Sequence, residues 1–370
     1  MVRAILVGTR KGLFTLSRSS AGWAVERVDF LGDPVQMVLH DTRDEATYAA
    51  LDLGHFGNKL HRRDAGGEFT EIPVPSYPEK PESEDDDLGA QNMKPVPWDL
   101  KGIWALESAG PDKAGALWCG TLPGGLFRSD DRGNTWQLNE PLWHSDDRRA
   151  WFGGGADWPA LHSVCVDPRD SDRVLIGVSC GGTWISEDGG VSWTVSSHGM
   201  RAEFMPPDEA GNPGVQDPHI VVQCPSAPDV YYTQHHCGIW KSDNGGTQWN
   251  EITADAPSRF GFAVVVHPND PDTAWFVPAV KDEARYAVGG TLCVTRTTDG
   301  GKTLQVLRNG LPQEHAYDIT LRHALAVDRT GTTLCFGTTT GNVFVSEDGG
   351  DSWSLVSGHL PPVYVVKMID

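Results

Sequence analysis

The sequence predicts an all-β protein, a seven-bladed β-propeller in which residues 1–370 form a single domain. Three observations predict it. A short turn pattern recurs along the chain, β-rich runs flank each copy, and the final run has no partner within its own unit. Recurrence at a nearly constant period is the signature of a repeat architecture. The repeat covers the whole chain, so one domain is favoured over the two or more that this length usually indicates.

The turn pattern combines a Ser or Thr, an Asp or Asn two residues later, a Gly two residues further on, and a closing Trp or Leu. Its five clear copies start 57, 56, 55 and 49 residues apart, at Ser129, Ser186, Ser242, Thr297 and Ser346. Weaker copies span Arg62–Phe69 and Ser17–Trp23. The hydroxyl and carboxylate can accept hydrogen bonds from backbone N–H groups of a tight turn, and the aromatic ring supplies a buried face. Seven copies predict seven blades.

The β-rich runs predict four strands in each blade. Two runs precede each turn and one follows it. In the fourth unit the four expected strands are Leu161–Val166, Arg173–Val178, Gly182–Ser186 and Ser192–Ser196. The third of these leads into the turn and the fourth follows it. The first unit lacks a leading strand, because Arg3–Val7 is already of the second type, whereas Val363–Met368 is a spare strand of the leading type. We therefore expect the C-terminal strand to complete the first blade and remove an open sheet edge.

Composition narrows the classes of partner. The formal net charge is −20 and no basic groove is visible, which argues against nucleic acid. Neither a signal peptide nor an apolar run of membrane-spanning length is present, so no membrane partner is expected. The seven Cys are odd in number and scattered, which favours reduced thiols and a cytoplasmic location. The sequence has no C-x-x-C zinc pattern, predicts no metal ligands and identifies no cofactor.

Insertions indicate where a site would lie. Connectors from an outer strand to the next inner strand are long at Pro73–Trp98, Glu140–Pro159 and Ser197–Pro218, and a shorter one spans Asn309–Ala316. Lys281–Gly290 is an insertion between the second and third strands of the sixth blade. Glu82–Asp87, within the first connector, is the most acidic stretch and is expected to be a solvated loop. In a propeller both connection types emerge opposite the repeated turns, so the insertions predict a walled axial cleft.

Polar and aromatic residues map to this predicted mouth. Asp217 and His219 begin the leading strand of the fifth blade, and Tyr317 and Asp318 begin that of the last blade, which also includes Arg322 and His323. The candidate catalytic residues are Asp217, Glu314 and His315. The candidate substrate-binding residues are Arg10, His219, His235, His236, Tyr317, Trp98 and Trp158. Each of these residues also has a structural interpretation. A His at a strand end often binds a loop carbonyl, and Glu314 would be a solvated acid on a loop.

The turn pattern resembles the Asp-box, or BNR repeat, of sialidase-like β-propellers, and the chain resembles cytosolic proteins named BNR-repeat glycosyl hydrolase or exo-alpha-sialidase-like. The resemblance implies that the turns join the third and fourth strands, away from an active site, and are structural. A sialidase also carries an N-terminal Arg-Ile-Pro signature, whereas the nearest feature here is Gly8–Gly12. Sialidase activity itself is therefore not expected.

Three functions stay open, and whether the protein is an enzyme is among the open points. The favoured one is a glycoside hydrolase-like enzyme, with Trp98, Trp143, Trp151 and Trp158 stacking on a carbohydrate or another small polar ligand. In this enzyme one carboxyl group would act as the acid and a second as the base or nucleophile. The candidates for these two groups are Asp217, Glu203, Glu314 and Asp318. A His-based lyase or hydrolase, with or without a metal, is the second. The third is a non-catalytic assembly factor with a protein partner.

Overall fold

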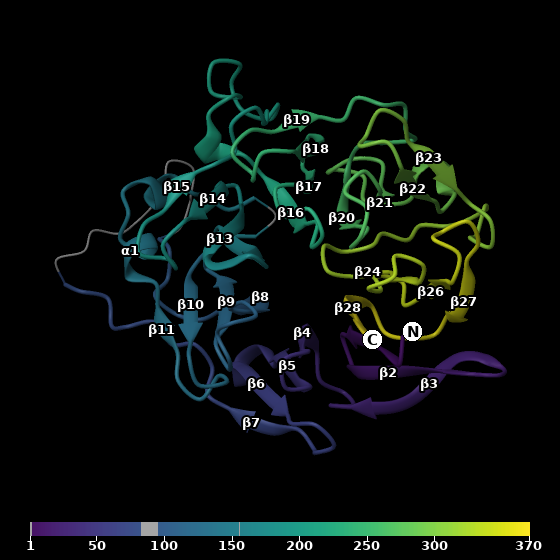
Figure 1. Cartoon of the computed structure of the whole chain (residues 1–370), viewed down its shortest axis with the longest axis horizontal. Coiled ribbons are helices and arrows are strands. Elements are labelled where there is room, and N and C mark those ends of the chain that lie inside the picture. Colours follow the sequence, from purple (N-terminus) through teal and green to yellow (C-terminus); the bar gives the residue numbers. More distant parts are fainter. Residues whose placement is uncertain (1, 83–94, 155) are drawn as a thin grey trace. The chain divides into compact units, whose positions relative to one another are not determined.

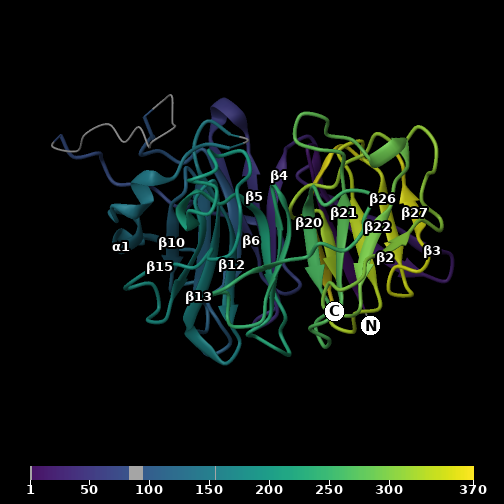
Figure 2. The same ribbon diagram turned by 90° about the horizontal axis from the view of Figure 1, so that it is seen from above.

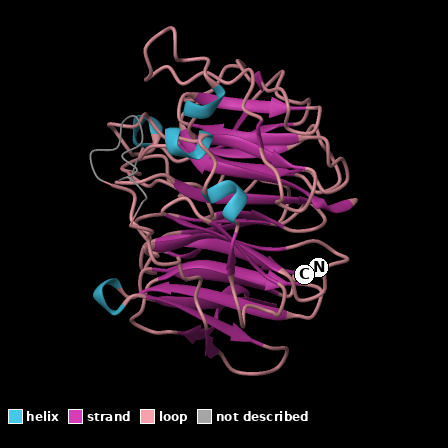
Figure 3. Ribbon diagram, turned by 90° about the vertical axis from the view of Figure 1, so that its left-hand side faces the viewer, coloured by secondary structure: helices cyan, strands magenta, loops and turns pink. Residues whose placement is uncertain are grey.

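The computed structural model describes residues 2–82, 95–154 and 156–370 (Figure 1). Over these residues the chain forms seven four-stranded sheets, and the fold is a seven-bladed β-propeller, as predicted. Strands dominate and the helices are short (Figure 3). The contacts divide the chain into unit 1, Met1–Val38, Val222–Lys241 and Asn250–Asp370, and unit 2, Leu39–Val221 and Ser242–Trp249. Part of the acidic stretch Glu82–Asp87 lies outside the described residues.

The strands follow one order in six blades, and the first blade differs. Blade 1 comprises β28 (Val363–Ile369), β1 (Ala4–Thr9), β2 (Gly12–Ser19) and β3 (Gly22–Asp29). Blade 2 comprises β4 (Val35–Asp41), β5 (Ala46–Asp52), β6 (Asn58–Arg63) and β7 (Thr70–Ile72). Blade 3 comprises β8 (Gly102–Ser108), β9 (Leu117–Leu122), β10 (Leu126–Ser129) and β11 (Gln137–Leu138). Blade 4 comprises β12 (Ala160–Asp167), β13 (Asp170–Ser179), β14 (Gly182–Ser186) and β15 (Thr194–Val195).

The remaining blades repeat this order. Blade 5 comprises β16 (Pro218–Gln223), β17 (Tyr231–His235), β18 (Gly238–Ser242) and β19 (Asn250–Glu251). Blade 6 comprises β20 (Gly261–Val266), β21 (Ala274–Pro278), β22 (Val294–Thr297) and β23 (Gln305–Leu307), and Figure 2 shows its first three strands side by side. Blade 7 comprises β24 (Leu325–Val327), β25 (Leu334–Gly337), β26 (Val343–Ser346) and β27 (Ser354–Ser357). The short helices are α1 (Glu140–Trp143), η1 (Gly54–Phe56), η2 (Asp147–Ala150), η3 (Pro213–Val215) and η4 (Val288–Gly290).

The first blade is completed by β28, which confirms the expectation for the C-terminal strand. β28 pairs antiparallel with β1, from Ala4 opposite Ile369 to Thr9 opposite Val363. A Cβ on Gly8 would lie 2.5 Å from Cγ1 of Val365, so the strands approach closely and glycine is required there. Val363, Val365 and Val366 are buried, and Val363 and Val366 belong to the apolar core that blades 1 and 7 share within unit 1. Both labelled chain ends lie beside this blade in Figure 1.

The leading strand of the last blade begins later than predicted. β24 starts at Leu325, so Tyr317, Asp318, Arg322 and His323 precede it rather than lying in it. The side chain of Asp318 accepts hydrogen bonds from Thr340 Oγ1 and Asn342 Nδ2, in the turn between β25 and β26. The segment is therefore held by side-chain bonds to Asp318 and by single backbone bonds, such as that from Thr339 N to Ile319 O at 2.9 Å, and not by a strand ladder. His323 instead forms an isolated bridge with Val365 of β28.

The repeated turn, called the repeat turn below, joins the third and fourth strands of a blade. In blade 4, Ser186 Oγ accepts from Gly190 N at 2.8 Å and donates to Asp188 Oδ1 at 2.8 Å. Asp188 also accepts from Ser192 N at 2.8 Å and Ser192 Oγ at 2.6 Å. The closing indole of Trp193 donates to Asn139 Oδ1, which follows the outer strand of blade 3, at 3.0 Å. The turn thus satisfies its own backbone and fastens one blade to the preceding one.

Removing a repeat-turn carboxylate is expected to lower thermal stability in a pH-dependent way. The hydrogen bonds from Ser192 lower the pKa of Asp188 to about 2, below the value of about 3.9 for an unfolded Asp. A lowered folded pKa stabilises the protein above the unfolded pKa, and this contribution is lost as pH falls through the folded pKa. The midpoint of Asp188→Ala should therefore lie below wild type at pH 7, and the gap should narrow between about pH 5 and pH 2.

Circular dichroism melts across this pH range would measure the gap. Asp188→Asn is the matched control, because the repeat turn of blade 5 naturally carries Asn244, whose Oδ1 accepts from Gln248 N at 3.1 Å. The Asn variant should therefore lose less stability than the Ala variant. A gap that stays constant down to pH 2 would contradict the role given to the carboxylate.

A partly buried arginine, Arg43, connects blades 2 and 3 at the edge where the repeat turns lie. Arg43 follows β4 and binds Asp41 through Nε at 2.8 Å and Nη2 at 2.6 Å. The same guanidinium donates to the carbonyls of Gly110, Lys113 and Ala116 at 2.8–2.9 Å, in the turn between β8 and β9. Burial raises the pKa of Asp41, but the hydrogen bonds and charge of Arg43 outweigh burial, and the net pKa is lowered.

Two further findings concern the expectations from composition. The seven cysteines are all free thiols, and burial raises the pKa of Cys119 and of Cys335. Among the helices that the structure describes, none has the length and apolar character needed to cross a bilayer.

Candidate functional site

The insertions gather, within each unit, at the blade edge opposite the repeat turns. In unit 2, Tyr77 of the first connector bonds through its hydroxyl to Thr121 Oγ1 at 2.6 Å, beside the turn between β9 and β10. Gly182, which begins β14, donates its N–H to Gln216 O at 2.8 Å. In unit 1, Ala316 N donates to Gly290 O at 2.9 Å, which joins the two insertions on either side of β22 and β23. Within each unit, these insertions therefore lie at the edge where they were predicted.

Asp217 is the centre of a buried polar group in unit 2, called the aspartate group below. Its Oδ1 accepts from Ser179 Oγ at 3.0 Å and from Cys180 N at 3.1 Å, at the end of β13. Its Oδ2 lies 3.7 Å from Nε2 of His219, in β16. Asp217 and His219 are 3 % and 2 % exposed. A carboxylate held on one oxygen and facing an imidazole with the other is suited to proton transfer.

The backbone around the aspartate group is unusual in two ways. Cys180 has φ 50°, a left-handed conformation that is rare for a residue other than glycine and is often found at functional sites. Gly154, from the connector after blade 3, approaches the group so closely that a Cβ would lie 2.6 Å from Cys180 Sγ and 3.5 Å from Asp217 Oδ2. Because Gly154 is exposed, the carboxylate lies directly beneath the surface of unit 2.

The connector tryptophans divide into buried and half-buried residues. Trp143 and Trp151 are 2 % and 1 % exposed, and the Arg148 guanidinium lies 3.9 Å from the Trp143 ring centroid. Buried rings cannot stack on a ligand, so this expectation for Trp143 and Trp151 was wrong. Trp98 is half-buried and meets Trp143 edge-on at 5.4 Å between centroids. Trp158 is half-buried and donates its Nε1–H to Pro95 O at 2.9 Å.

Two exposed tyrosines in unit 1 lie at the insertions on either side of β22 and β23. Tyr286, in the segment between β21 and β22, is 40 % exposed, and Tyr317, before β24, is 60 % exposed. Their ring centroids are 6.4 Å apart and their planes are inclined by 67°. Glu314 and His315 are also exposed and are separated from Tyr317 in sequence by Ala316, and His315 has φ 54°. We call Tyr286 and Tyr317 the tyrosine pair.

Charged groups lie on the same two insertions and on the neighbouring strands. Asp282 binds Arg285 at 2.5 Å, and its Oδ2 lies 4.0 Å from Nε2 of His236, which follows β17. The guanidinium groups of Arg285 and Arg322 each lie 5.5 Å from the ring centroid of Phe262 in β20. His236 is half-buried, with its ring 5.8 Å from that of Phe260. This edge of unit 1 therefore combines aromatic faces with hydrogen-bonding groups.

The other predicted residues have individual surroundings. His235 is fully buried, accepts through Nδ1 from Cys237 N at 3.0 Å and packs on Trp240 at 4.7 Å, which is the loop-fastening alternative considered for a strand-end His. Arg10 follows β1 and is exposed. Unit 1 holds six of the ten candidates: Arg10, His235, His236, Glu314, His315 and Tyr317. Unit 2 holds the other four: Trp98, Trp158, Asp217 and His219. One pocket formed by all ten stays a prediction.

Sequence reasoning missed five residues of these groups: Ser179, Cys180, Asp282, Arg285 and Tyr286. Ser179 ends a second strand, a class of position that was nominated in other blades, so the signal for it was present. Asp282, Arg285 and Tyr286 lie in an insertion that was recognised, but an irregular loop has no periodicity that indicates which side chains are exposed.

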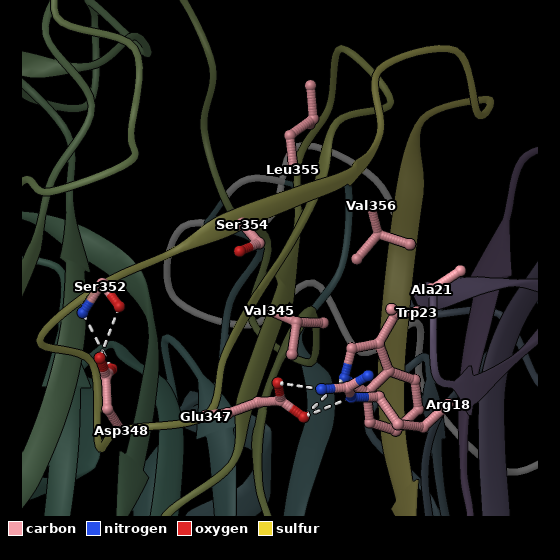
Figure 4. A pocket seen from close by; sticks show the side chains of 11 residues that line it. Arg18, Ala21, Trp23, Val345, Glu347, Asp348, Ser352, Ser354, Leu355 and Val356 are labelled. Atoms are coloured by element: carbon pink, nitrogen blue, oxygen red, sulfur yellow. Dashed lines mark hydrogen bonds and ion pairs between the residues drawn. The ribbon is translucent and has the colours of Figure 1, made fainter.

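A cavity of ≈ 480 Å³ lies elsewhere in unit 1, between the outer parts of blades 1 and 7 (Figure 4). Figure 4 shows the Glu347 carboxylate directed at Arg18 and Trp23, with bonds of 2.7 Å to Arg18 Nε and 3.2 Å from Trp23 Nε1. Asp348 and Ser352 of the repeat turn also line it. Its polar groups bind one another across two blades, so we assign this cavity to the structural edge of the fold.

Comparison of the sequence with known proteins found two named relatives, and comparison of the structure found a solved protein with the same fold. The chain is 26 % identical over 261 residues to an oligoxyloglucan-reducing end-specific xyloglucanase of Emericella nidulans, a match covering 67 % of this chain and 26 % of the relative. A probable enzyme of the same name from Neosartorya fischeri is 27 % identical over 224 residues, covering 52 % and 25 % of the two chains. The chain thus spans about a quarter of the length of these curated relatives.

A solved structure agrees with the architecture. The GH74 xyloglucanase of Xanthomonas campestris superimposes with a TM-score of 0.64 at 18 % identity, over 96 % of this chain and 53 % of that protein. No family model matches the chain. At this level of identity the structural similarity establishes the propeller fold, while function has to be argued from sites.

Proposed function

We propose that the protein is a glycoside hydrolase-like propeller that binds a carbohydrate and cleaves a glycosidic bond. The observation that carries this proposal is the similarity of two thirds of the chain to a named xyloglucanase. The polar and aromatic groups at the insertion edges of both units supply the side chains that such a reaction needs. Substrates related to the xyloglucan oligosaccharides of that relative are the first to test.

The aspartate group supplies one of the two carboxyl groups that glycoside hydrolysis requires. Asp217 has donors on Oδ1, which fix the orientation of the carboxyl group, while Oδ2 faces His219. His219 would then orient the carboxyl group and influence its proton affinity as a positioning residue. Glu314, exposed beside His315 in unit 1, was selected from the sequence as a catalytic acid, and its role stays a prediction.

Hydrolysis of xyloglucan oligosaccharides, followed by the release of new reducing ends, tests the proposal. Replacing a catalytic acid or base usually lowers the rate by about 10²- to 10⁴-fold, and we expect losses of this order for Asp217→Asn and Glu314→Gln. Asp130→Asn is the matched control, because Asp130 is an exposed acid of a repeat turn with 69 % of its side chain exposed. Circular dichroism melts would establish that each variant is folded.

Three outcomes would overturn parts of the proposal. Wild type that neither binds nor cleaves the oligosaccharides would contradict it as a whole. Binding without turnover would support the non-catalytic alternative. Turnover that disappears on addition of a chelator would favour the metal-assisted alternative.

A further inference from the structure

We propose that the tyrosine pair is a saccharide-binding subsite for two consecutive sugar rings, an inference that rests on the proposed function. Tyr286 and Tyr317 are large aromatic residues with 40 % and 60 % of their surface exposed, and they contact each other across two different insertions. Exposing apolar surface costs about 25 cal/mol per Å², so a pair of exposed aromatic rings on charged loops is a candidate binding surface.

The two insertions that carry the pair are held rigidly together. Ala316 N donates to Gly290 O at 2.9 Å, and Leu292 N donates to Pro312 O at 3.0 Å. The side chain of Gln313 donates to Leu292 O at 2.9 Å and accepts from Arg308 Nη1 at 3.2 Å. These bonds join residues on either side of β22 and β23. A ligand that binds there does not have to order the loops, which reduces the entropic cost of binding.

The geometry of the pair indicates a ligand longer than one sugar. Ring planes inclined by 67° cannot both lie flat against one pyranose ring. They can each cover one ring of two successive residues whose planes are turned relative to each other. An aromatic face fits the C–H side of a sugar, and the phenolic hydroxyls can bond to its hydroxyl groups.

The surroundings of the pair match a hydroxyl-rich ligand. Glu314 and His315 are exposed and are separated from Tyr317 only by the buried Ala316, and Arg285 directly precedes Tyr286 and is bound to Asp282. Carboxylate, imidazole and guanidinium groups provide donors and acceptors of fixed position for sugar hydroxyls. We therefore assign the subsite to a neutral oligosaccharide of at least two residues.

Isothermal titration calorimetry with a xyloglucan heptasaccharide and with D-glucose tests this assignment. We expect Tyr317→Ala and Tyr286→Ala each to weaken heptasaccharide binding by about tenfold or more, the loss expected for a buried aromatic anchor. Tyr317→Phe should retain most of the affinity, since it keeps the ring. Glucose should bind much more weakly than the heptasaccharide to wild type. Leu355→Ala is the control, because Leu355 is 55 % exposed on β27 and lines the cavity between the outer parts of blades 1 and 7.

The outcomes separate this inference from the proposed function. If wild type binds the heptasaccharide and both Ala variants bind it equally well, the subsite is wrong and the proposed function stands. Equal affinity for glucose and the heptasaccharide would overturn the two-ring assignment. If wild type binds neither sugar, the inference and the proposed function fail together. Unchanged thermal midpoints of the Tyr variants would exclude unfolding as the cause of lost binding.

Discussion

Removing residues 363–370 is expected to unfold the protein or to leave it without a cooperative thermal transition. The deletion takes away β28, the strand paired with β1 from Ala4 to Thr9. It also removes Val363, Val365 and Val366, each at most 1 % exposed. Burial of a Val side chain contributes about 1.5–3 kcal/mol, and three such losses approach a typical total stability of about 5–15 kcal/mol.

Differential scanning calorimetry of the truncated and full-length chains would measure this effect. Val365→Asp tests the same packing without shortening the chain, because it places a charge against Gly8 of β1, and it should also destabilise severely. Lys367→Ala is the control, since Lys367 belongs to the same strand and is partly exposed. A truncated protein that melts at the wild-type temperature would refute the closing role of β28.

Arg43→Ala should cause the second largest loss of stability. The Asp41 and Arg43 side chains are 2 % and 16 % exposed. Removing one partner of a buried ion pair typically costs about 3–5 kcal/mol, because a buried charge is left uncompensated. The variant also loses the bonds from Arg43 to the carbonyls of Gly110, Lys113 and Ala116 in the β8–β9 turn, although each carbonyl keeps a backbone N–H donor.

Urea denaturation would give the change in the free energy of unfolding. Lys59→Ala, in the same blade, is the control: its pair with Glu71 has side chains 37 % and 54 % exposed and should contribute no more than about 1 kcal/mol. Adding Asp41→Asn to Arg43→Ala should recover part of the loss, because no buried charge then remains. An Arg43→Ala variant no less stable than Lys59→Ala would refute the role of this arginine.

The architecture could be predicted because its signals are local and recur. Each repeat turn specifies its own bonds over a few residues, as from Ser186 to Ser192, so the pattern is visible without knowledge of the fold. The pairing of the C-terminal strand could be predicted by counting β-rich runs, because the first unit lacks one run and the chain ends with a spare one. The start of β24 was not, because Asp318 is held by Thr340 and Asn342, more than 20 residues away, and such a long-range bond leaves no trace in strand periodicity.

The candidate site could be predicted only in part. Strand ends indicated Asp217 and His219, and the structure places these two side chains together and buried, while their role stays a prediction. The same reasoning selected His235, whose position at a strand end was correct but whose ring is fully enclosed by Trp240 and its own turn. Alternation along a strand identifies a face, whereas side-chain burial depends on neighbours from distant segments. The tyrosine pair had no sequence signal beyond the length of the insertion around Tyr286.

The pairing of β28 with β1 also determines the order in which this protein can fold during synthesis. The two strands lie more than 350 residues apart in sequence. At about 5–20 residues per second, a ribosome needs on the order of tens of seconds to make the intervening chain. Throughout that time β1 has β2 on one side and an unsatisfied edge on the other. The first blade is thus the first to be translated and the last to be completed, which makes nascent β1 a natural target for chaperones that shield unpaired strand edges.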